Sequence, residues 1–429
     1  MLKYLWTVTQ DLLLTVTLIT LMHAVLYRLY GIKGRRAHWI GIGAGLVAAA
    51  ALAIVKNTTK LIISSHWNHY IFGFMLGFML AFLILSLIFG RKENAPWGVG
   101  GALTCVAGAG LTAILIFYAA PGVMAYPYNF NTMGNGYLSA QFFERLAGWA
   151  AALLLLLIYV HALHRCALHW KGFGWLLAAL NAGSIAYGVY ALGMFFAPWI
   201  TRAKWLKWPV KFSVAEFGWV QKYSLFVSRH SLLFTWIVLA LAAVVAVGRI
   251  LQSARVTDPY DNPAQLRKLR ARNRKFRRTA GLALACLGIA AVVLTFVKAY
   301  DTRVIELSPP ETYAIEGDQV MVPLEQFEDG HLHRFEYTTE KNIAVRWIVI
   351  KKPGSGTYGV GLDACEVCGN AGYFERNGQV VCKRCDVVMN INTIGFRGGC
   401  NPIPLSYRIE NGQMVFNMAD ILAGEKEFR

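Results

Sequence analysis

The chain has 429 residues, of which 56% are hydrophobic and 15% are charged, whereas an ordinary soluble domain carries roughly 25% charged residues. This composition excludes a disordered chain and a simple cytosolic protein. The net charge of +18 would suggest a nucleic-acid partner, but its distribution is uneven. Residues 1–299 hold 29 basic and six acidic side chains, and residues 300–429 hold 13 and 18. We therefore expect two domains with these boundaries, and no nucleic-acid partner.

The first domain contains about eight apolar runs close to the 20 residues that a helix needs to cross a lipid membrane. They lie near 9–30, 38–56, 68–90, 97–120, 143–163, 174–197, 231–250 and 279–298. Lys and Arg favour cytoplasmic loops. They concentrate here in loops on one side of an eight-span topology: 31–37, 91–96, 164–173 and 249–278. We predict a polytopic α-helical membrane bundle with both termini outside the cytoplasm.

One connecting segment departs from this charge pattern. Residues 198–230 lie outside in the eight-span topology but carry six basic side chains. Four tryptophans alternate with them: Trp199, Trp205, Trp208 and Trp219. This composition is typical of a helix that lies in the lipid headgroup layer, and a solvated connector is the alternative.

Ionisable side chains inside spans are costly, so each one is a candidate functional residue. His66 and His69 would share one face of a helix. Together with His230, Asp11 and Glu144, they fall near the outer ends of spans. Such a cluster could bind a metal ion or hold a quinol, or the five side chains could face water separately.

A haem held by two histidines is a further alternative for the membrane domain. His23 and His161 are candidate ligands, although no helix carries the spaced histidine pair typical of a two-haem bundle. Cys105, Cys166 and Cys286 are isolated in apolar surroundings, which is typical of cysteines that only pack.

Beyond residue 299 the apolar runs become short and rich in β-branched or aromatic residues, which is typical of strands. We predict strands near 319–323, 333–339, 343–350, 357–362, 378–381 and 413–416. Asp-Gly at 329–330 and Asn-Gly at 377–378 and 411–412 indicate hairpin turns. A small β-rich extracytoplasmic domain is therefore expected to follow the bundle.

Five of the eight cysteines lie within 36 residues of this domain: Cys365, Cys368, Cys382, Cys385 and Cys400. Two Cys-x-x-Cys turns that face each other form a four-sulfur metal site. We expect the first four cysteines to form it, with Cys400 as a fifth sulfur that serves as an alternative ligand or a redox partner. A structural zinc site, an iron or iron–sulfur site, and disulfides or thiol exchange all remain open, although five cysteines cannot all pair.

Other chemistry-bearing groups are sparse. His331 and His333 alternate along a predicted strand, so they could supply further metal ligands or form a solvated strand face. No nucleotide-binding loop, nucleophile elbow or His-Glu-x-x-His sequence occurs, so a hydrolase or ATPase has no support.

The cysteine motifs resemble a known family. Asp-Ala-Cys-Glu-Val-Cys-Gly at 363–369, Val-Val-Cys-Lys-Arg-Cys at 380–385 and Gly-Gly-Cys-Asn-Pro-Ile-Pro-Leu at 398–405 resemble the C-terminal domain of FtrD-like bacterial membrane iron–sulfur proteins. The resemblance implies a component of an iron-uptake system, beside an iron permease and a periplasmic iron-binding protein. It also implies that the five cysteines handle electrons or metal. The spans lack an Arg-Glu-x-x-Glu signature, so we do not expect the permease itself.

Two functions follow as hypotheses. The first is a redox protein of the bacterial inner membrane. Its bundle takes electrons from the quinone pool or an inner partner, and its external cysteine site passes them to iron before or during import. The second is a non-catalytic, zinc-stabilised or metal-capturing module that docks partner proteins at the membrane. Visible colour distinguishes them, because an iron centre absorbs visible light and zinc does not.

Overall fold

The structure, a computed structural model, describes most of the chain. The described residues are 1–59, 64–90, 92–130, 139–303, 306–354, 356–376, 378–384, 387–398 and 400–428, without 201–217. The side chains at 64–66, 129, 141 and 198–200 are not described either. The chain divides into two compact units, Met1–Thr302 and Arg303–Arg429.

Within the described residues, the first unit has seven helices that are long and apolar enough to cross a membrane. They are α1 (Leu2–Thr58), α2 (Ser64–Phe89), α3 (Val99–Ala125), α4 (Ala140–Leu168), α5 (Phe173–Ile200), α7 (Ser231–Gln252) and α8 (Pro263–Val292). After α8 the chain continues through a π-helical turn, Val293–Val297, into α9 (Lys298–Asp301). The predicted helical membrane domain is confirmed, and two of the eight predicted apolar runs share α1.

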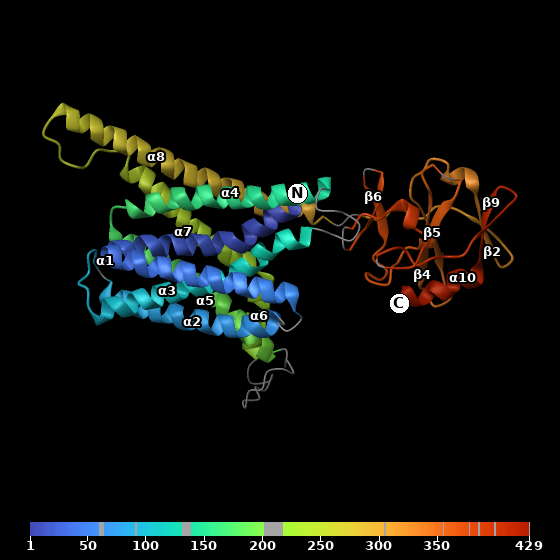
Figure 1. The fold of residues 1–429 in the computed structure, drawn as a ribbon, viewed down its shortest axis with the longest axis horizontal. Helices are drawn as coiled ribbons and strands as arrows, with labels where there is room; N and C mark the ends of the chain where they lie inside the picture. Colours follow the sequence, from blue (N-terminus) through green and yellow to red (C-terminus); the bar gives the residue numbers. More distant parts are fainter. Residues whose placement is uncertain are drawn as a thin grey trace. The chain divides into compact units, whose positions relative to one another are not determined.

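Helix α1 is bent back on itself at Gly31. The backbone of Gly31 has φ 58° and ψ −132°, a conformation that favours glycine because it lacks a Cβ atom. The two arms, residues 2–30 and 32–58, lie side by side (Figure 1). The second arm packs closely on α3, because a Cβ atom at Gly41 would lie 2.4 Å from the Ala109 carbonyl oxygen. The bend therefore brings residues on both sides of Gly31 into one region of the bundle.

The segment predicted to lie in the headgroup layer is described only in part. Its last residues form the amphipathic helix α6 (Gly218–Arg229). Val220 and Val227 are buried, whereas Trp219 is exposed. Ser224 Oγ donates a hydrogen bond of 2.9 Å to the Gly193 carbonyl on α5. Residues 201–217 lie outside the described part of the chain.

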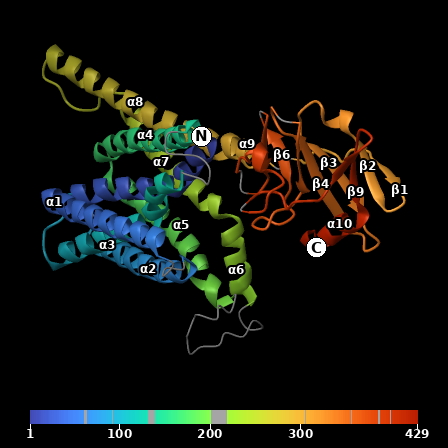
Figure 2. The same ribbon diagram turned by 45° about the vertical axis from the view of Figure 1, so that its right-hand side comes forward.

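The second unit is β-rich, as predicted, and Figure 2 shows its strands and the helix α10 (Met418–Ala423). One antiparallel sheet has the order β1-β2-β9-β8, a second the order β3-β4-β5, and β6 and β7 form a hairpin. The strands are β1 (Ala314–Glu316), β2 (Gln319–Pro323), β3 (His333–Thr338), β4 (Ala344–Lys351), β5 (Tyr358–Leu362), β6 (Tyr373–Arg376), β7 (Gln379–Cys382), β8 (Arg408–Glu410) and β9 (Gln413–Asn417). Trp347 is fully buried in its core, where its ring stacks on Phe335 and contacts Phe416.

Two of the three predicted hairpin turns of this unit, at 377–378 and 411–412, connect neighbouring strands. Asn411 and Gly412, with φ 49° and 78°, connect β8 to β9, and Gly378, with φ 71°, lies between β6 and β7. Gly330 is different, because its N–H donates to the Phe327 carbonyl and closes the 3₁₀ helix Leu324–Phe327. The expected hairpin at 329–330 is therefore a helix end that leads into β3.

Candidate metal centre

The first Cys-x-x-Cys segment forms a tight turn that prepares a thiolate site. Cys365 and Gly369 exchange both backbone hydrogen bonds, at 3.1 and 2.9 Å. Gly369 has φ 65°, a conformation that favours glycine. Inside the turn, the backbone N–H of Cys368 donates to Sγ of Cys365 at 3.1 Å. Such a bond stabilises negative charge on the sulfur, which is the form that binds metal.

Three sulfurs lie together at this turn. The Sγ atoms of Cys365, Cys368 and Cys400 all lie within 4.8 Å of one another. Cys365 and Cys368 are buried, whereas Cys400 is half-buried. With metal–sulfur bonds of about 2.3 Å, a tetrahedral site has sulfur–sulfur edges of about 3.8 Å. A cluster that spreads its ligands over several irons would hold the sulfurs farther apart. The three-sulfur group therefore fits one tetrahedral ion bound by thiolates.

The described part of the second Cys-x-x-Cys segment, residues 382–384, lies beside the first. Cys382 ends β7 and is buried in the same apolar cluster as Cys365 and Cys368, but its sulfur is not part of the three-sulfur group. The Arg384 guanidinium donates a hydrogen bond of 3.1 Å to the Cys368 carbonyl and so connects the two segments. Cys385 lies outside the described residues. Metal binding by all five cysteines stays a prediction.

Tyr373 connects β6 to the three-sulfur group. It lies opposite Cys382 in the β6–β7 hairpin and is almost fully buried. Its hydroxyl donates a hydrogen bond of 2.6 Å to the Cys400 carbonyl. Burial, and next the neighbouring Cys365 thiol, raise the pKa of Tyr373 far above its usual value. The phenol therefore stays protonated and holds the backbone of Cys400 beside the other two cysteines.

A buried ionic network supports this arrangement. Asp363 is fully buried, and its Oδ2 accepts hydrogen bonds from Nε of Arg334 at 3.0 Å and Nε of Arg346 at 3.1 Å. Its Oδ1 accepts from the Tyr373 N–H at 2.8 Å, and Arg334 also donates to the Tyr373 carbonyl. The network fixes the backbone from which the Tyr373 side chain reaches Cys400. This network was not predicted from the sequence, although Asp363, two residues before Cys365, was a signal.

The two histidines of the β-rich unit bind carboxylates. His331 is exposed, and its Nδ1 lies 3.0 Å from Glu375. His333 is buried, with Nδ1 2.9 Å from Glu311 and Nε2 2.8 Å from Asp329. Neither belongs to the three-sulfur group. Their predicted part in metal binding stays a prediction.

The outer histidines of the membrane unit have separate surroundings. Nδ1 of buried His69 lies 2.9 Å from the Phe195 carbonyl, and its ring stacks on Phe195. Nδ1 of His230 lies 2.9 Å from the carbonyl of Phe226, one turn earlier in the chain. The His66 side chain lies outside the described residues. The neighbours of these histidines nevertheless meet, because Asn68 and Ser231 line one cavity together with Asp11.

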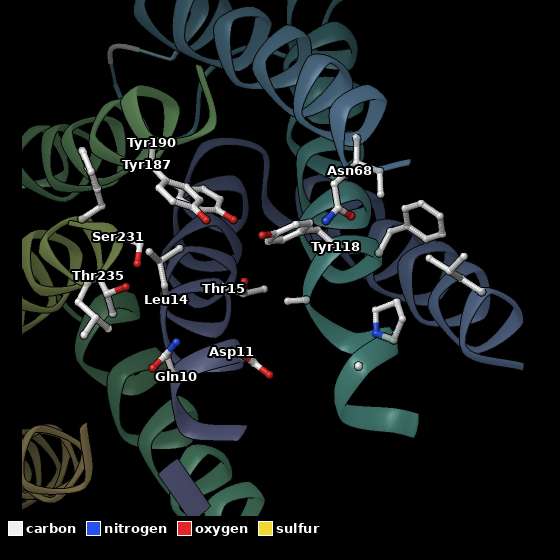
Figure 3. Close-up of a pocket in the computed structure, with 18 of the residues that line it drawn as sticks. Gln10, Asp11, Leu14, Thr15, Asn68, Tyr118, Tyr187, Tyr190, Ser231 and Thr235 are labelled. Carbon is white, nitrogen blue, oxygen red and sulfur yellow. The ribbon is translucent and has the colours of Figure 1, made fainter. Parts of the chain in front are cut away.

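This cavity has a volume of about 340 Å³ and is lined by polar and aromatic side chains of the described membrane helices (Figure 3). Tyr118 from α3 points across it toward Tyr187 and Tyr190 from α5 (Figure 3), whose rings stack on each other. Asp11 on α1 accepts a hydrogen bond of 2.8 Å from the Tyr126 hydroxyl. Aromatic walls, phenolic donors and a carboxylate suit a flat molecule with hydrogen-bonding oxygens.

Comparison with known proteins identifies the C-terminal region. Residues 327–428 match the family described as "Membrane iron-sulfur containing protein FtrD-like". No curated protein and no solved structure matches the chain. The matched region holds all three members of the three-sulfur group. The C-terminal region of this membrane protein is therefore FtrD-like, as its cysteine motifs predicted.

Proposed function

We propose that the protein is a redox component of a bacterial iron-uptake system, acting beside an iron permease and a periplasmic iron-binding protein. The observation that carries this proposal is the three-sulfur group within the FtrD-like region. Cys365, Cys368 and Cys400 are the proposed ligands, and Cys382 or Cys385 would complete a four-coordinate site. Iron bound by these thiolates would supply one-electron exchange between its ferrous and ferric forms.

The surroundings of the cysteines suit an iron site that exchanges electrons. Cys365 and Cys368 are shielded by apolar neighbours, which limits access of water to their sulfurs. Cys400 is half-buried, so this side of the group is open to an incoming iron ion or partner protein. Hydrogen bonds to ligand sulfurs and burial are the features by which a protein adjusts the potential of thiolate-bound iron. The Cys368 N–H and the buried surroundings supply both.

For the source of electrons we propose a quinol bound in the cavity of Figure 3. Asn68 and Tyr190 line this cavity and offer hydrogen-bond donors to the oxygens of a quinone ring. Asp11 is positioned to accept a proton released when a quinol is oxidised. Oxidation of one quinol releases two electrons and two protons, so two one-electron transfers to the cysteine site would balance it.

The proposal includes the topology of the chain in the membrane. The basic loops of the membrane unit favour the cytoplasmic side, which supports eight spans if the two arms of α1 each cross the membrane. The chain would then begin and end outside the inner membrane. Iron outside this membrane would meet the cysteine site before or during import.

A second candidate function is a zinc-stabilised or metal-capturing docking module. The spacing of the three sulfurs favours a single tetrahedral ion, and zinc prefers this coordination. A zinc site would hold the β-rich unit together without exchanging electrons.

Metal analysis with visible and electron paramagnetic resonance spectra distinguishes the two functions. The full chain is purified without oxygen and treated with dithionite. The redox proposal expects bound iron and visible absorption that changes on reduction. Stoichiometric zinc, with no change on reduction, would refute the redox proposal and support the docking module.

A further inference from the structure

We propose that the membrane unit holds a second metal site, formed by His23, His38 and His164, that binds one transition-metal ion through neutral imidazole nitrogens. The three side chains line a cavity of about 290 Å³, together with His161. The site uses none of the cysteines and does not rest on the proposed redox function.

The bend in α1 creates this cluster. His23 and His38 are 15 residues apart in the sequence, which in a straight helix would separate them by about 22 Å along the axis. Because α1 folds back at Gly31 (Figure 1), their ring centres lie 4.9 Å apart. His164 on α4 brings a third ring to within 4.8 Å of His23.

The two ring separations that involve His23 match rings around one ion. With a metal–nitrogen bond of about 2.1 Å, the centre of an imidazole ring lies about 3.2 Å from the ion. Two such rings are then about 4.5 Å apart at a right angle and about 5.2 Å apart at the tetrahedral angle. The measured 4.9 and 4.8 Å lie between these values. Among the described residues the nitrogens do not all lie within 4.8 Å of one another. We infer that the His23 and His164 rings rotate about χ2 toward the ion, while Thr112 holds His38 in place.

The hydrogen bonds of His38 leave its Nε2 available as a ligand. His38 is fully buried, and its Nδ1 lies 3.3 Å from Oγ1 of Thr112. The Thr112 hydroxyl already donates to the Gly108 carbonyl at 2.8 Å, so His38 Nδ1 must be the donor and carry the ring proton. Nε2 then has a lone pair, the arrangement that a neighbouring hydrogen-bond partner imposes on metal-binding histidines.

Two ring nitrogens in the cavity lack a partner. Nε2 of His38 and Nε2 of His164 are buried without a hydrogen bond among the described residues. An unsatisfied buried polar group costs about 1–3 kcal/mol, and ionisable residues within spans are typically functional. A metal ion would satisfy both nitrogens.

The lining also indicates which ions would bind. The cavity wall contains no carboxylate and no thiol among the described residues, and Ile19, Ile42 and Leu157 contribute apolar surface. Imidazole favours zinc, copper, iron or nickel, whereas magnesium and calcium require oxygen ligands. We expect ferrous, cobaltous or zinc ions to bind and magnesium not to compete.

The test is cobalt titration of the full chain in lipid nanodiscs, followed by visible absorption. All five cysteines of the β-rich unit are replaced by serine as the background, so that thiolate binding in that unit does not contribute. We expect one cobalt ion per chain, displaced by zinc but not by magnesium. Thr112→Val keeps the shape of the side chain and should weaken binding about 10–100-fold. His164→Gln should weaken binding at least as much, and His230→Ala, at an exposed histidine, is the matched control.

The proposal is overturned if the background chain binds no cobalt, or if Thr112→Val and His164→Gln bind it as tightly as His230→Ala does. Size-exclusion chromatography of each variant excludes loss of fold as the cause of weaker binding. Thr112→Val keeps the test decisive even if substitution of a histidine prevents folding, because Thr112 does not itself reach the proposed ion.

Discussion

Replacing Cys400 with serine should remove bound metal as effectively as replacing Cys365 or Cys368. The three sulfurs all lie within 4.8 Å of one another, so Cys400 is close enough to share an ion with both. Four-ligand structural zinc sites bind with about 10–16 kcal/mol, so that one ligand accounts for about 2.5–4 kcal/mol. At 1.4 kcal/mol per tenfold change, this is a loss of affinity of about 10²–10³-fold.

The assay is competition for the metal between the purified full chain and a chelator of known affinity. Cys105→Ser and Cys286→Ser are matched controls, because both cysteines are buried in the membrane unit and should leave the affinity unchanged. Cys382→Ser shows whether that sulfur completes the site. If Cys400→Ser retains metal at the original affinity while Cys382→Ser loses it, the three-sulfur group is not the metal site, and Cys400 is a peripheral sulfur.

Three other predictions concern the β-rich unit. Asp363→Asn breaks a buried ionic network and should lower the free energy of unfolding of this unit by about 3–5 kcal/mol. Hydrogen exchange measures this loss, with Asp318→Asn as an exposed control. A loss below about 1 kcal/mol would contradict the prediction. Tyr373→Phe leaves the Cys400 carbonyl without its donor and should lower the free energy of unfolding by about 1–3 kcal/mol. Tyr337→Phe, at a partly exposed strand position, should leave that free energy unchanged. The hydrogen bond to Glu375 raises the pKa of His331 above its usual 6.5, so its stabilising effect is present below pH 6.5 and is lost as the pH rises through the raised pKa. An NMR titration should show the His331 pKa falling in Glu375→Gln, and an unchanged value would refute this cause.

Much of the fold was predictable because it depends on local patterns. The eight apolar runs are long enough to identify the helices, and period-two alternation identified β2, β3, β4, β5, β7 and β9 within a few residues. β1 and β8 have three residues each, too few for a pattern to emerge. The reversal of the chain between the runs 9–30 and 38–56 was predicted as a loop at 31–37. Its position at Gly31 was not, because the sequence does not show which glycine adopts φ 58°.

The sites were less predictable because they depend on contacts between distant segments. Spacing identified the Cys-x-x-Cys turns, but it cannot show that Cys400 lies near Cys365. The position of Cys400 depends on Tyr373 and on the network of Asp363 and Arg334, whose members come from different strands and loops. In the membrane unit, His23, His38 and His164 come together because the chain bends at Gly31. Their spacing in the sequence therefore did not predict a histidine cluster.

The polar cavities of the membrane unit favour the redox function over a passive scaffold. A bundle whose only task was to display a zinc-stabilised domain could be apolar throughout, because ionisable residues within spans are costly. This unit instead contains Asp11 in a cavity with three tyrosines. A quinol site requires polar groups at this depth, where the hydrocarbon-soluble molecule arrives from the lipid. Asp11→Asn should therefore weaken binding of a short-chain quinone to the full chain, with Tyr223→Phe on α6 as a control. If both variants bind the quinone equally, the cavity with Asp11 no longer favours the redox protein over the docking module.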